Sequence, residues 1–192
     1  MLVVVRHGRT VWNVEGRFQG RADVPLDSVG RRQSRETAAA LSVVVGPPLE
    51  IVSSDLLRAA ETASTIAGAL GGSVRAEVEL REVDVGAWEG LTRAKVQALY
   101  PDDFSRWSAG EDIRRGRGET RAEAGSRVAG VVKRLLAATT RPLIVVGHGV
   151  SLQAGLAQLG EEGIITLDGP PPHLGNGRFL ALTTEMGRES VA

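Results

Sequence analysis

The sequence predicts an α/β fold in which helices cover both faces of a mostly parallel sheet. Short apolar runs rich in β-branched residues alternate along the chain with longer segments whose apolar residues recur every three or four positions. Alternation of this kind is typical of parallel sheets, because a helix must connect each pair of parallel strands. The chain has 192 residues, 42% of them hydrophobic, which is enough for one well-buried domain. We therefore expect one domain over residues 1–192, with a mixed sheet of five to six strands.

Four apolar runs are the expected strands, and a fifth segment is a further candidate. Each run is short and is bounded by charged residues, glycine or proline, as buried strands usually are. The four runs are Leu2–Val5, Glu50–Ser53, Val74–Val78 and Pro142–Val146, and the fifth candidate is Arg178–Thr183.

Four helices are expected between or after these strands. Two of them follow residues whose side-chain oxygens can accept from the free N–H groups of a first helical turn, namely Ser28 and Thr120. The expected helices cover residues 29–45, residues 56–70, the segment from Thr120 to Ala138, and the segment after Gly149.

The stretch from Asp84 to Gly118 differs from the rest of the chain because it lacks strand character. It holds two of the three tryptophans, Trp88 and Trp107. We expect an insertion that folds over the edge of the sheet as a small lid, with a short helix near Thr92–Tyr100. The two tryptophans are expected to form the core of this lid.

The composition excludes several classes of function. The 23 basic and 23 acidic side chains balance, so no bulk charge indicates a nucleic-acid or membrane partner. No apolar stretch approaches the roughly 20 residues that span a bilayer. The absence of cysteine excludes disulfides, thiol nucleophiles and cysteine metal sites. No secretory signal is visible at the N-terminus, so we expect a cytoplasmic protein.

Arginine supplies nearly all of the positive charge, since the only lysines are Lys95 and Lys133. Codon bias in a GC-rich genome explains this excess more simply than selection for phosphate contacts. An arginine is therefore informative only through its position in the predicted fold.

Two of the three histidines stand in the same local context. His7 follows the first apolar run and an arginine, His148 follows the run that ends at Val146 and a glycine, and each histidine precedes a glycine. Ligands of open α/β sheets bind beyond the carboxyl ends of the strands, so both imidazoles are expected at one sheet edge. A purely structural role, in which the ring caps the end of its own strand, explains either histidine alone. It explains the presence of both poorly.

Two further polar residues follow the remaining strands. Arg58 lies just inside the predicted helix after the second strand, where a helix N-terminus favours anions. Glu82 follows the third strand and is the carboxylate nearest another strand end. Each residue alone is typical of a solvated surface. Together with the two histidines they form one group of polar residues at the strand ends, which we call the constellation.

This constellation suits phosphoryl transfer through a phosphohistidine. A neutral imidazole can attack phosphorus in line, and guanidinium groups bind phosphate oxygens and stabilise the charge of the transition state. A carboxylic acid can protonate the leaving oxygen and then deprotonate the water that releases phosphate. This chemistry needs no cofactor, and no histidine and carboxylate cluster in the sequence indicates a metal site.

The motifs of the chain, in combination and order, resemble those of the histidine phosphatase superfamily, also called the phosphoglycerate-mutase-like family. The resemblance covers essentially the whole chain. Its motifs are Arg6-His7-Gly8-Arg9-Thr10-Val11-Trp12-Asn13, Gln19-Gly20, Asp23-Val24-Pro25-Leu26, Gly30, the Ser53-Ser54-Asp55 to Thr62 segment, Leu80-Arg81-Glu82, Gly86-Ala87-Trp88-Glu89-Gly90, Gly118-Glu119-Thr120 and Gly147-His148-Gly149.

The resemblance implies a phosphoglycerate-mutase-like fold with a variable lid and a role for each residue of the constellation. His7 would be the phosphorylated nucleophile, and Glu82 would be the proton donor and later the base. Arg6, Arg58 and His148 would hold the transferring phosphoryl group. The other implied substrate contacts are Asn13, Gln19, Gly20 and Gly149.

The resemblance leaves two reactions open, because mutases and phosphatases of this family share the phosphohistidine. By this resemblance, mutases of the family have longer chains, whose extra segments enclose the phosphohistidine against water. Their motif after the glutamate also differs from the one after Glu82. We therefore favour hydrolysis of a small-molecule phosphate ester. Three substrates stay open within that reaction: a broad range of small phosphate esters, glucosyl-3-phosphoglycerate, and α-ribazole 5′-phosphate.

Several features stay outside this assignment. A weakly catalytic member that binds protein partners, including a phosphoprotein phosphatase, is a further alternative, although binding alone needs no proton donor. The resemblance leaves open that the protein forms a homodimer, but no apolar surface stripe in the sequence marks an interface. His173 is expected to make a loop or oligomer contact. The lid arginines Arg114, Arg115 and Arg117 could meet an anionic substrate, but a solvated loop is favoured.

Overall fold

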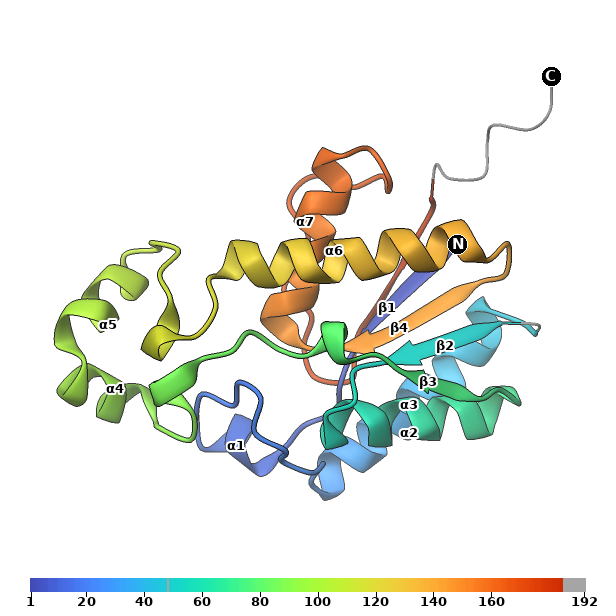
Figure 1. Ribbon diagram of the computed structural model, residues 1–192. Coiled ribbons are helices and arrows are strands. Elements are labelled where there is room, and N and C mark those ends of the chain that lie inside the picture. The colour runs from blue at the N-terminus through green and yellow to red at the C-terminus, as the bar shows by residue number, and fades with distance from the viewer. Residues whose placement is uncertain (48, 185–192) are drawn as a thin grey trace.

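A five-stranded mixed sheet lies between two layers of helices in the computed structural model, which describes residues 1–47 and 49–184 (Figure 1). The strand order is β3-β2-β4-β1-β5, and within the described residues β5 is the one strand that runs antiparallel to its neighbour. The predicted fold class is therefore confirmed. The strands are β1 (Leu2–Arg6), β2 (Glu50–Ser53), β3 (Val74–Ala76), β4 (Leu143–Gly147) and β5 (Phe179–Leu182).

The register of the two central strands places the two strand-end histidines side by side. β1 and β4 pair in parallel from Leu2 with Leu143 to Arg6 with Gly147. The residue after each strand is a histidine, and the backbone N–H of His7 donates to the carbonyl oxygen of Gly147 at 3.0 Å. The pairing of these two buried strands therefore determines where both imidazoles lie.

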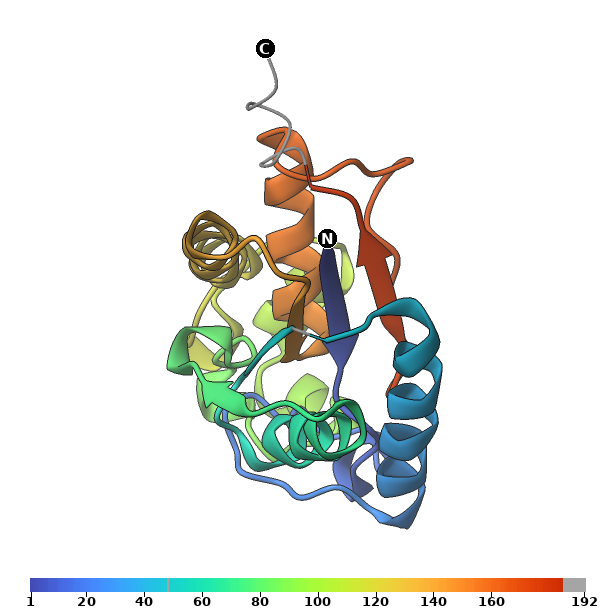
Figure 2. The same cartoon turned by 90° about the vertical axis from the view of Figure 1, so that its right-hand side faces the viewer.

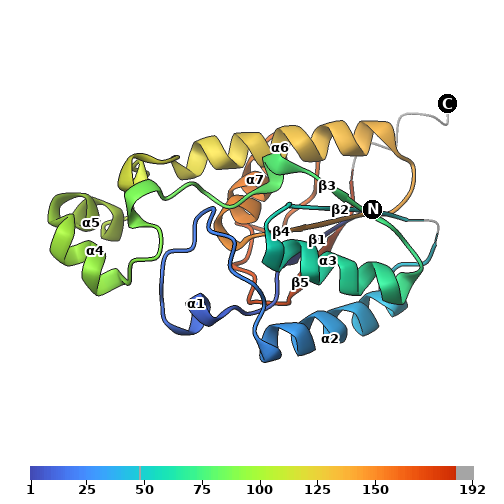
Figure 3. The ribbon, with the colours of Figure 1, turned by 60° about the horizontal axis from the view of Figure 1, so that its bottom comes forward.

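Helices cover both faces of the sheet, as Figures 2 and 3 show. Alternate side chains of β1 belong to different cores, because successive residues of a strand point to opposite faces. Val3 and Val5 pack with the first pair of helices, whereas Leu2 and Val4 pack with the second pair. The first pair is α2 (Ser28–Val44) and α3 (Leu57–Leu70), and the second is α6 (Arg121–Ala138) and α7 (Gly149–Glu161).

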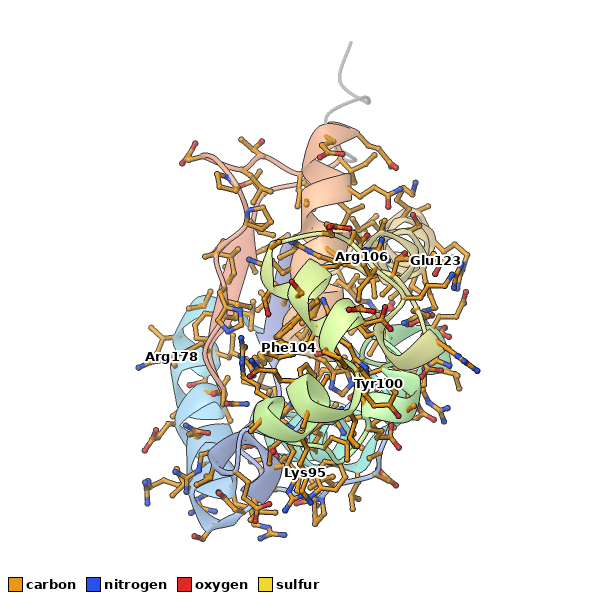
Figure 4. All side chains as sticks on the ribbon, turned by 90° about the vertical axis from the view of Figure 1, so that its left-hand side faces the viewer. Lys95, Tyr100, Phe104, Arg106, Glu123 and Arg178 are labelled. Carbon is orange, nitrogen blue, oxygen red and sulfur yellow. The ribbon has the colours of Figure 1, made fainter. Side chains whose placement is uncertain are left out.

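The 84–118 segment forms a helical unit beyond the carboxyl ends of the strands, at the left in Figure 1 and in front in Figure 4. It has its own small core around the fully buried Trp88, to which Trp107 adds an edge-on ring at 5.8 Å between centroids. Its elements are a 3₁₀ turn at Gly86–Trp88, α4 (Arg93–Leu99), α5 (Pro101–Ser108) and a 3₁₀ turn at Arg115–Arg117. The remaining short elements of the described chain are α1 (Val11–Val14) and a 3₁₀ turn at Val78–Leu80.

Three details differ from the sequence prediction. Asp27 rather than Ser28 caps α2, since its carboxylate accepts from the N–H of Gly30 at 2.7 Å. Strand β3 ends at Ala76 because its partner β2 ends at Ser53, directly opposite. The second helix of the 84–118 segment, α5, was not expected, although Pro101 at its first position is a common helix start.

No helix of the described part of the chain is long and apolar enough to cross a membrane.

Candidate active site

His7 is buried at the end of β1 with one ring nitrogen already engaged. Its Nδ1 lies 2.7 Å from the carbonyl oxygen of Gly8. A carbonyl oxygen can only accept, so Nδ1 carries the proton and the lone pair of the ring is on Nε2. Burial, and then the charge of Arg58, lower the pKa of His7 well below the usual value of 6.5. The ring is therefore neutral and nucleophilic at neutral pH.

His148 lies directly beside His7 and is completely buried. The two ring centroids are 5.2 Å apart with an interplanar angle of 59°. The Nε2 atom of His148 lies 2.8 Å from the hydroxyl of Ser54, which follows the neighbouring strand β2. Burial and the charge of Arg58 also lower the pKa of His148 well below 6.5, so this ring is neutral as well.

Arg58 is a fully buried guanidinium at the start of α3. It donates from Nη1 to the carbonyl of Ala22 at 2.7 Å and from Nη2 to that of Gly20 at 2.9 Å. Its Nε is buried without a hydrogen-bond partner among the described residues. Burial lowers the pKa of Arg58 to about 10, which leaves the group charged at neutral pH.

Arg6, the last residue of β1, is held in a similar way. Its Nη1 donates to the carbonyl of Leu174 at 2.7 Å and lies 3.1 Å from Nε2 of His173. Its Nε is also buried and unpartnered within the described chain. A Cβ atom at Gly149 would lie 3.1 Å from Cζ of Arg6, so this glycine leaves room for the guanidinium.

Glu82 projects from the segment after β3 to the start of α7. One carboxylate oxygen accepts from the N–H of Ser151 at 2.8 Å, and the other accepts from that of Val150 at 3.2 Å. These N–H groups belong to the first turn of α7, where backbone amides lack helical partners and attract negative charge. Glu82 thereby joins the third strand to the helix that follows His148.

A cation from α6 fixes the segment that leads to Glu82. Arg127 donates to the carbonyl oxygen of Arg81 at 3.0 Å and also to that of Glu79, and it pairs with Glu119 at 2.9 Å. Arg81 forms a two-point ion pair with Asp55 after β2. These contacts explain why a carboxylate on an irregular segment has a defined position.

Asn13, in α1, and Gln19, on the loop after it, have their amide oxygens occupied. Oδ1 of Asn13 accepts from the N–H of Thr10 at 3.0 Å, and Oε1 of Gln19 lies 3.0 Å from the Thr10 hydroxyl. Both amide NH₂ groups therefore stay available for an anion. Gly20 has a φ of +51°, and a Cβ atom there would lie 2.5 Å from a methyl group of Val85, so only glycine presents this carbonyl to Arg58 without strain.

These side chains surround one pocket of about 260 Å³. Of the residues predicted from the sequence, His148 and Gly149 do not line this pocket but adjoin His7 and Arg6, which do. The 84–118 segment adds Val85, Arg93, Trp107 and Arg115 to the wall. The predicted residues that line the pocket are Arg6, His7, Asn13, Gln19, Gly20, Arg58 and Glu82.

The three neighbouring arginines of the 84–118 segment have different surroundings in the structure. Arg115 lines the pocket, whereas Arg114 pairs with Glu123 and Arg117 is exposed. The expectation of a solvated loop is therefore wrong for Arg115, which is half-buried and faces the pocket. The sequence could not separate three arginines within four positions.

One supporting residue was missed. Asn176 donates to the carbonyl oxygen of His7 at 3.2 Å and lies 3.3 Å from Oδ1 of Asn13. Its position between two glycines before the last strand was the available signal. His173, expected to make a loop or oligomer contact, lies in the loop before β5, with its Nε2 3.1 Å from Nη1 of Arg6.

Within the described residues, no three histidine, aspartate or glutamate side chains are grouped as metal ligands would be.

Comparison with known proteins identifies relatives over nearly the whole chain. A family model described as the histidine phosphatase superfamily (branch 1) matches residues 2–191. A glucosyl-3-phosphoglycerate phosphatase of Mycobacterium tuberculosis is 37% identical over 172 residues, covering 82% of this chain and 75% of the relative. A probable phosphoglycerate mutase of Yersinia enterocolitica is 36% identical over 177 residues, covering 88% and 75%.

Solved structures agree with these matches. A mycobacterial glucosyl-3-phosphoglycerate phosphatase in complex with VO3 superposes with a TM-score of 0.81 at 33% identity, covering 93% of this chain and 90% of that one.

Proposed function

The chain belongs to the histidine phosphatase superfamily (branch 1) and is a phosphatase of that type, and from this premise we propose that it hydrolyses small phosphate esters through a phosphohistidine at His7. The proposal rests mainly on one observation. The contact of His7 Nδ1 with the carbonyl of Gly8 leaves the Nε2 lone pair for a pocket that is also lined by Arg6, Arg58 and Glu82.

In the first step, Nε2 of His7 attacks phosphorus opposite the ester oxygen. The N–P bond forms, the P–O ester bond breaks, and the leaving oxygen takes a proton from Glu82. In the second step Glu82 removes a proton from water, which attacks phosphorus and breaks the N–P bond. Inorganic phosphate leaves, and His7 returns to its neutral form.

Arg6 and Arg58 stabilise the charge on the phosphoryl oxygens in both steps. Nη1 of Arg6 and both terminal nitrogens of Arg58 donate to backbone carbonyls, so the guanidiniums need no rearrangement when charge develops. The buried Nε of each group is one donor left for phosphate. Truncation of either residue should therefore lower kcat as well as raise KM.

His148 is proposed to donate one further hydrogen bond to the phosphoryl group. The Ser54 hydroxyl accepts from the N–H of Leu56 at 3.3 Å, so its own proton is free to be donated to Nε2 of His148. The ring proton of His148 is then on Nδ1, which is buried and unpartnered within the described chain. Asn13 and Gln19 would supply amide donors from the opposite loop.

The substrate is proposed to be a small phosphorylated metabolite of the glucosyl-3-phosphoglycerate type. Support comes from the relatives named for that activity and from a pocket of about 260 Å³, which suits a small molecule. The 84–118 segment would act as a lid within a single domain spanning residues 1–192. We also propose a cytoplasmic enzyme that needs no metal, with no nucleic-acid or membrane partner and with a homodimer left open.

Phosphoglycerate mutase activity is the second candidate function, since relatives with about the same sequence identity to this chain are named probable phosphoglycerate mutases. One assay series separates the candidates. Purified protein with and without a chelator is given p-nitrophenyl phosphate, glucosyl-3-phosphoglycerate, α-ribazole 5′-phosphate and each phosphoglycerate. We expect phosphate release that the chelator does not change. Isomerisation faster than hydrolysis would establish the mutase, and strict metal dependence would contradict the proposed mechanism.

A further inference from the structure

The peptide group between Gly8 and Arg9 is held at both of its polar ends. Its carbonyl oxygen, on Gly8, accepts from Nδ1 of His7 at 2.7 Å. Its N–H, on Arg9, donates to Oε1 of Gln33 at 2.8 Å. A peptide group is planar, so the directions of its carbonyl and of its N–H are fixed together. Gln33 therefore helps to determine where the oxygen that meets the His7 ring lies.

The plane of this peptide group depends on such a contact because residue 8 is a glycine. A Cβ atom at Gly8 would lie 2.4 Å from the carbonyl oxygen of Gly30, and one at Gly30 would lie 2.1 Å from that of Arg9. Both glycines are therefore required where α2 meets the loop after β1. Glycine has no side chain that restricts rotation of the next peptide group. The restraint on the plane must come from outside, and Gln33 supplies it.

Gln33 is itself firmly placed in the second turn of α2, where it is half-buried. A Cβ atom at Gly177 would lie 2.7 Å from the Cβ of Gln33, so the stem of the side chain packs directly against that backbone. Gly177 donates its N–H to the carbonyls of Arg6 and His7, both at 3.1 Å, and its own carbonyl accepts from the Thr37 hydroxyl of α2. The glutamine is thus held against the residue that fixes the end of β1.

The tautomer of His7 decides whether the ring can attack phosphorus. With the proton on Nδ1, the ring donates to the Gly8 oxygen and has its lone pair on Nε2. With the proton on Nε2, the lone pair of Nδ1 would face those of the Gly8 oxygen. Positive charge develops on the ring as the N–P bond forms, which makes Nδ1–H a stronger donor. Hydrogen bonds in a chain polarise one another, so the Arg9 N–H and the Gln33 oxygen share in stabilising that charge.

We propose that Gln33 is a positioning residue for the nucleophile. By holding the Gly8–Arg9 peptide group, it keeps the proton of His7 on Nδ1 and stabilises the imidazolium that forms when Nε2 attacks phosphorus. The second effect rests on the proposed function, whereas the first is a property of the resting protein. Gln33 does not line the catalytic pocket, so it acts through the peptide group and not on the substrate.

The tautomer is measured by ¹⁵N NMR of histidine-labelled protein near neutral pH without phosphate, with the His7 resonances assigned by their loss in His7→Gln. We expect a protonated Nδ1 in the wild type. Gln33→Met keeps the length of the side chain but not its acceptor, and should populate the Nε2-protonated form. Gln33→Glu keeps an acceptor and should show the wild-type tautomer. Gln158→Met, the same change on α7 where the amide donates to Glu162, is the control and should also show the wild-type tautomer.

Kinetics with p-nitrophenyl phosphate test the effect on the reaction. In Gln33→Met we expect kcat to fall about tenfold with an unchanged KM, as the loss of one hydrogen bond in the transition state implies. Gln33→Glu should regain most of that loss. A fall in kcat that is as large in Gln33→Glu as in Gln33→Met, or a raised KM with an unchanged kcat, would assign Gln33 to packing and overturn the proposal.

The wild-type protein offers a test that no substitution can disturb. Vanadate, which can bond to Nε2 as phosphorus does, should move the amide proton of Arg9 downfield further than inorganic phosphate does. An Arg9 proton that responds equally to both anions, or an unchanged tautomer in Gln33→Met, would overturn the role of Gln33. Absence of wild-type turnover on every ester would contradict the proposed function instead, and the tautomer would still decide whether Gln33 holds the proton.

Discussion

A single backbone carbonyl decides which nitrogen of His7 can react. Because the oxygen of Gly8 accepts from Nδ1, the nucleophilic lone pair is on Nε2, and the low pKa of the buried ring keeps that pair free at neutral pH. The neighbouring His148 is held in the same neutral state by burial and by Arg58. In the proposed mechanism, two chemically identical side chains thus have different roles that follow from their hydrogen-bond partners.

Glu82→Gln tests the proton-transfer role at the same scale. The amide keeps an oxygen for the N–H groups of α7 but cannot donate a carboxylic proton, so kcat should fall by about 10² to 10⁴. The loss should be larger for alkyl phosphates than for p-nitrophenyl phosphate, whose leaving group needs little protonation. Steady-state kinetics on both esters measure this difference.

Glu79→Gln is the matched control, since its carboxylate pairs with Arg134 at the surface, away from the pocket. An equal loss for good and poor leaving groups in Glu82→Gln would assign Glu82 a purely structural role.

The sequence predicted individual residues where a local pattern was enough. His7 and His148 each follow an apolar run and precede a glycine, so their shared sheet edge could be expected. The choice of Arg115 among three nearby arginines could not be, because it depends on a turn whose shape comes from distant backbone contacts. Asn176 was hidden for the same reason, since its partner is 169 positions away along the chain.

At the scale of elements, strand register and glycine packing position the site. Strands β1 and β4 end together and β2 ends one residue earlier, which brings His7 beside His148 and the Ser54 hydroxyl to 2.8 Å from His148. The predicted strands and long helices agree with the structure because their hydrophobic periodicity is strong. Strand β3 was expected to be longer because its end depends on the length of β2, which periodicity does not report.

Gly116→Ala tests whether the glycine contact holds the 84–118 segment in place. The added methyl group would meet the carbonyl of Val85 in a residue with a φ of +56°. The backbone conformation costs about 1 to 2 kcal/mol for a residue with a side chain, and overpacking adds about 1 to 3 kcal/mol. Chemical denaturation should show both losses, together with a higher KM.

Gly110→Ala separates the cost of the backbone conformation from the cost of overpacking. Gly110 has a φ of +91° in the same segment, but a Cβ atom there would meet no heavy atom of the described residues within 4 Å. This variant should lose only the conformational term. If both variants lose the same free energy of unfolding, close packing at Gly116 contributes nothing.

At the scale of the whole molecule, two neutral histidines in the core make stability depend on pH. Both pKa values are below 6.5 in the folded state, so between those values and 6.5 the unfolded chain binds protons that the folded chain does not. The free energy of unfolding should therefore fall as pH falls below 6.5, by up to about 1.4 kcal/mol per pH unit for each histidine. Urea unfolding at pH 7.5 and 5.5 measures this slope.

The measurement needs a buffer without phosphate, because a bound anion stabilises the folded state. The carboxylates with shifted pKa values, such as Asp55 and Glu119, have values lowered from 3.8 and 4.5 and titrate below this window. His7→Gln should about halve the slope. Constant stability between the two pH values would show that the buried histidines titrate as free ones do.

The central claim is that phosphate passes through Nε2 of His7. The most direct measurement is an alkaline quench of the enzyme during turnover, followed by mass spectrometry of the peptide that contains His7 and ³¹P NMR of the phosphohistidine. We predict phosphate on Nε2 of His7 and none in a folded His7→Ala variant, which should also lose turnover. Phosphate on Nδ1 or on His148, or wild-type kcat in His7→Ala, would contradict the account.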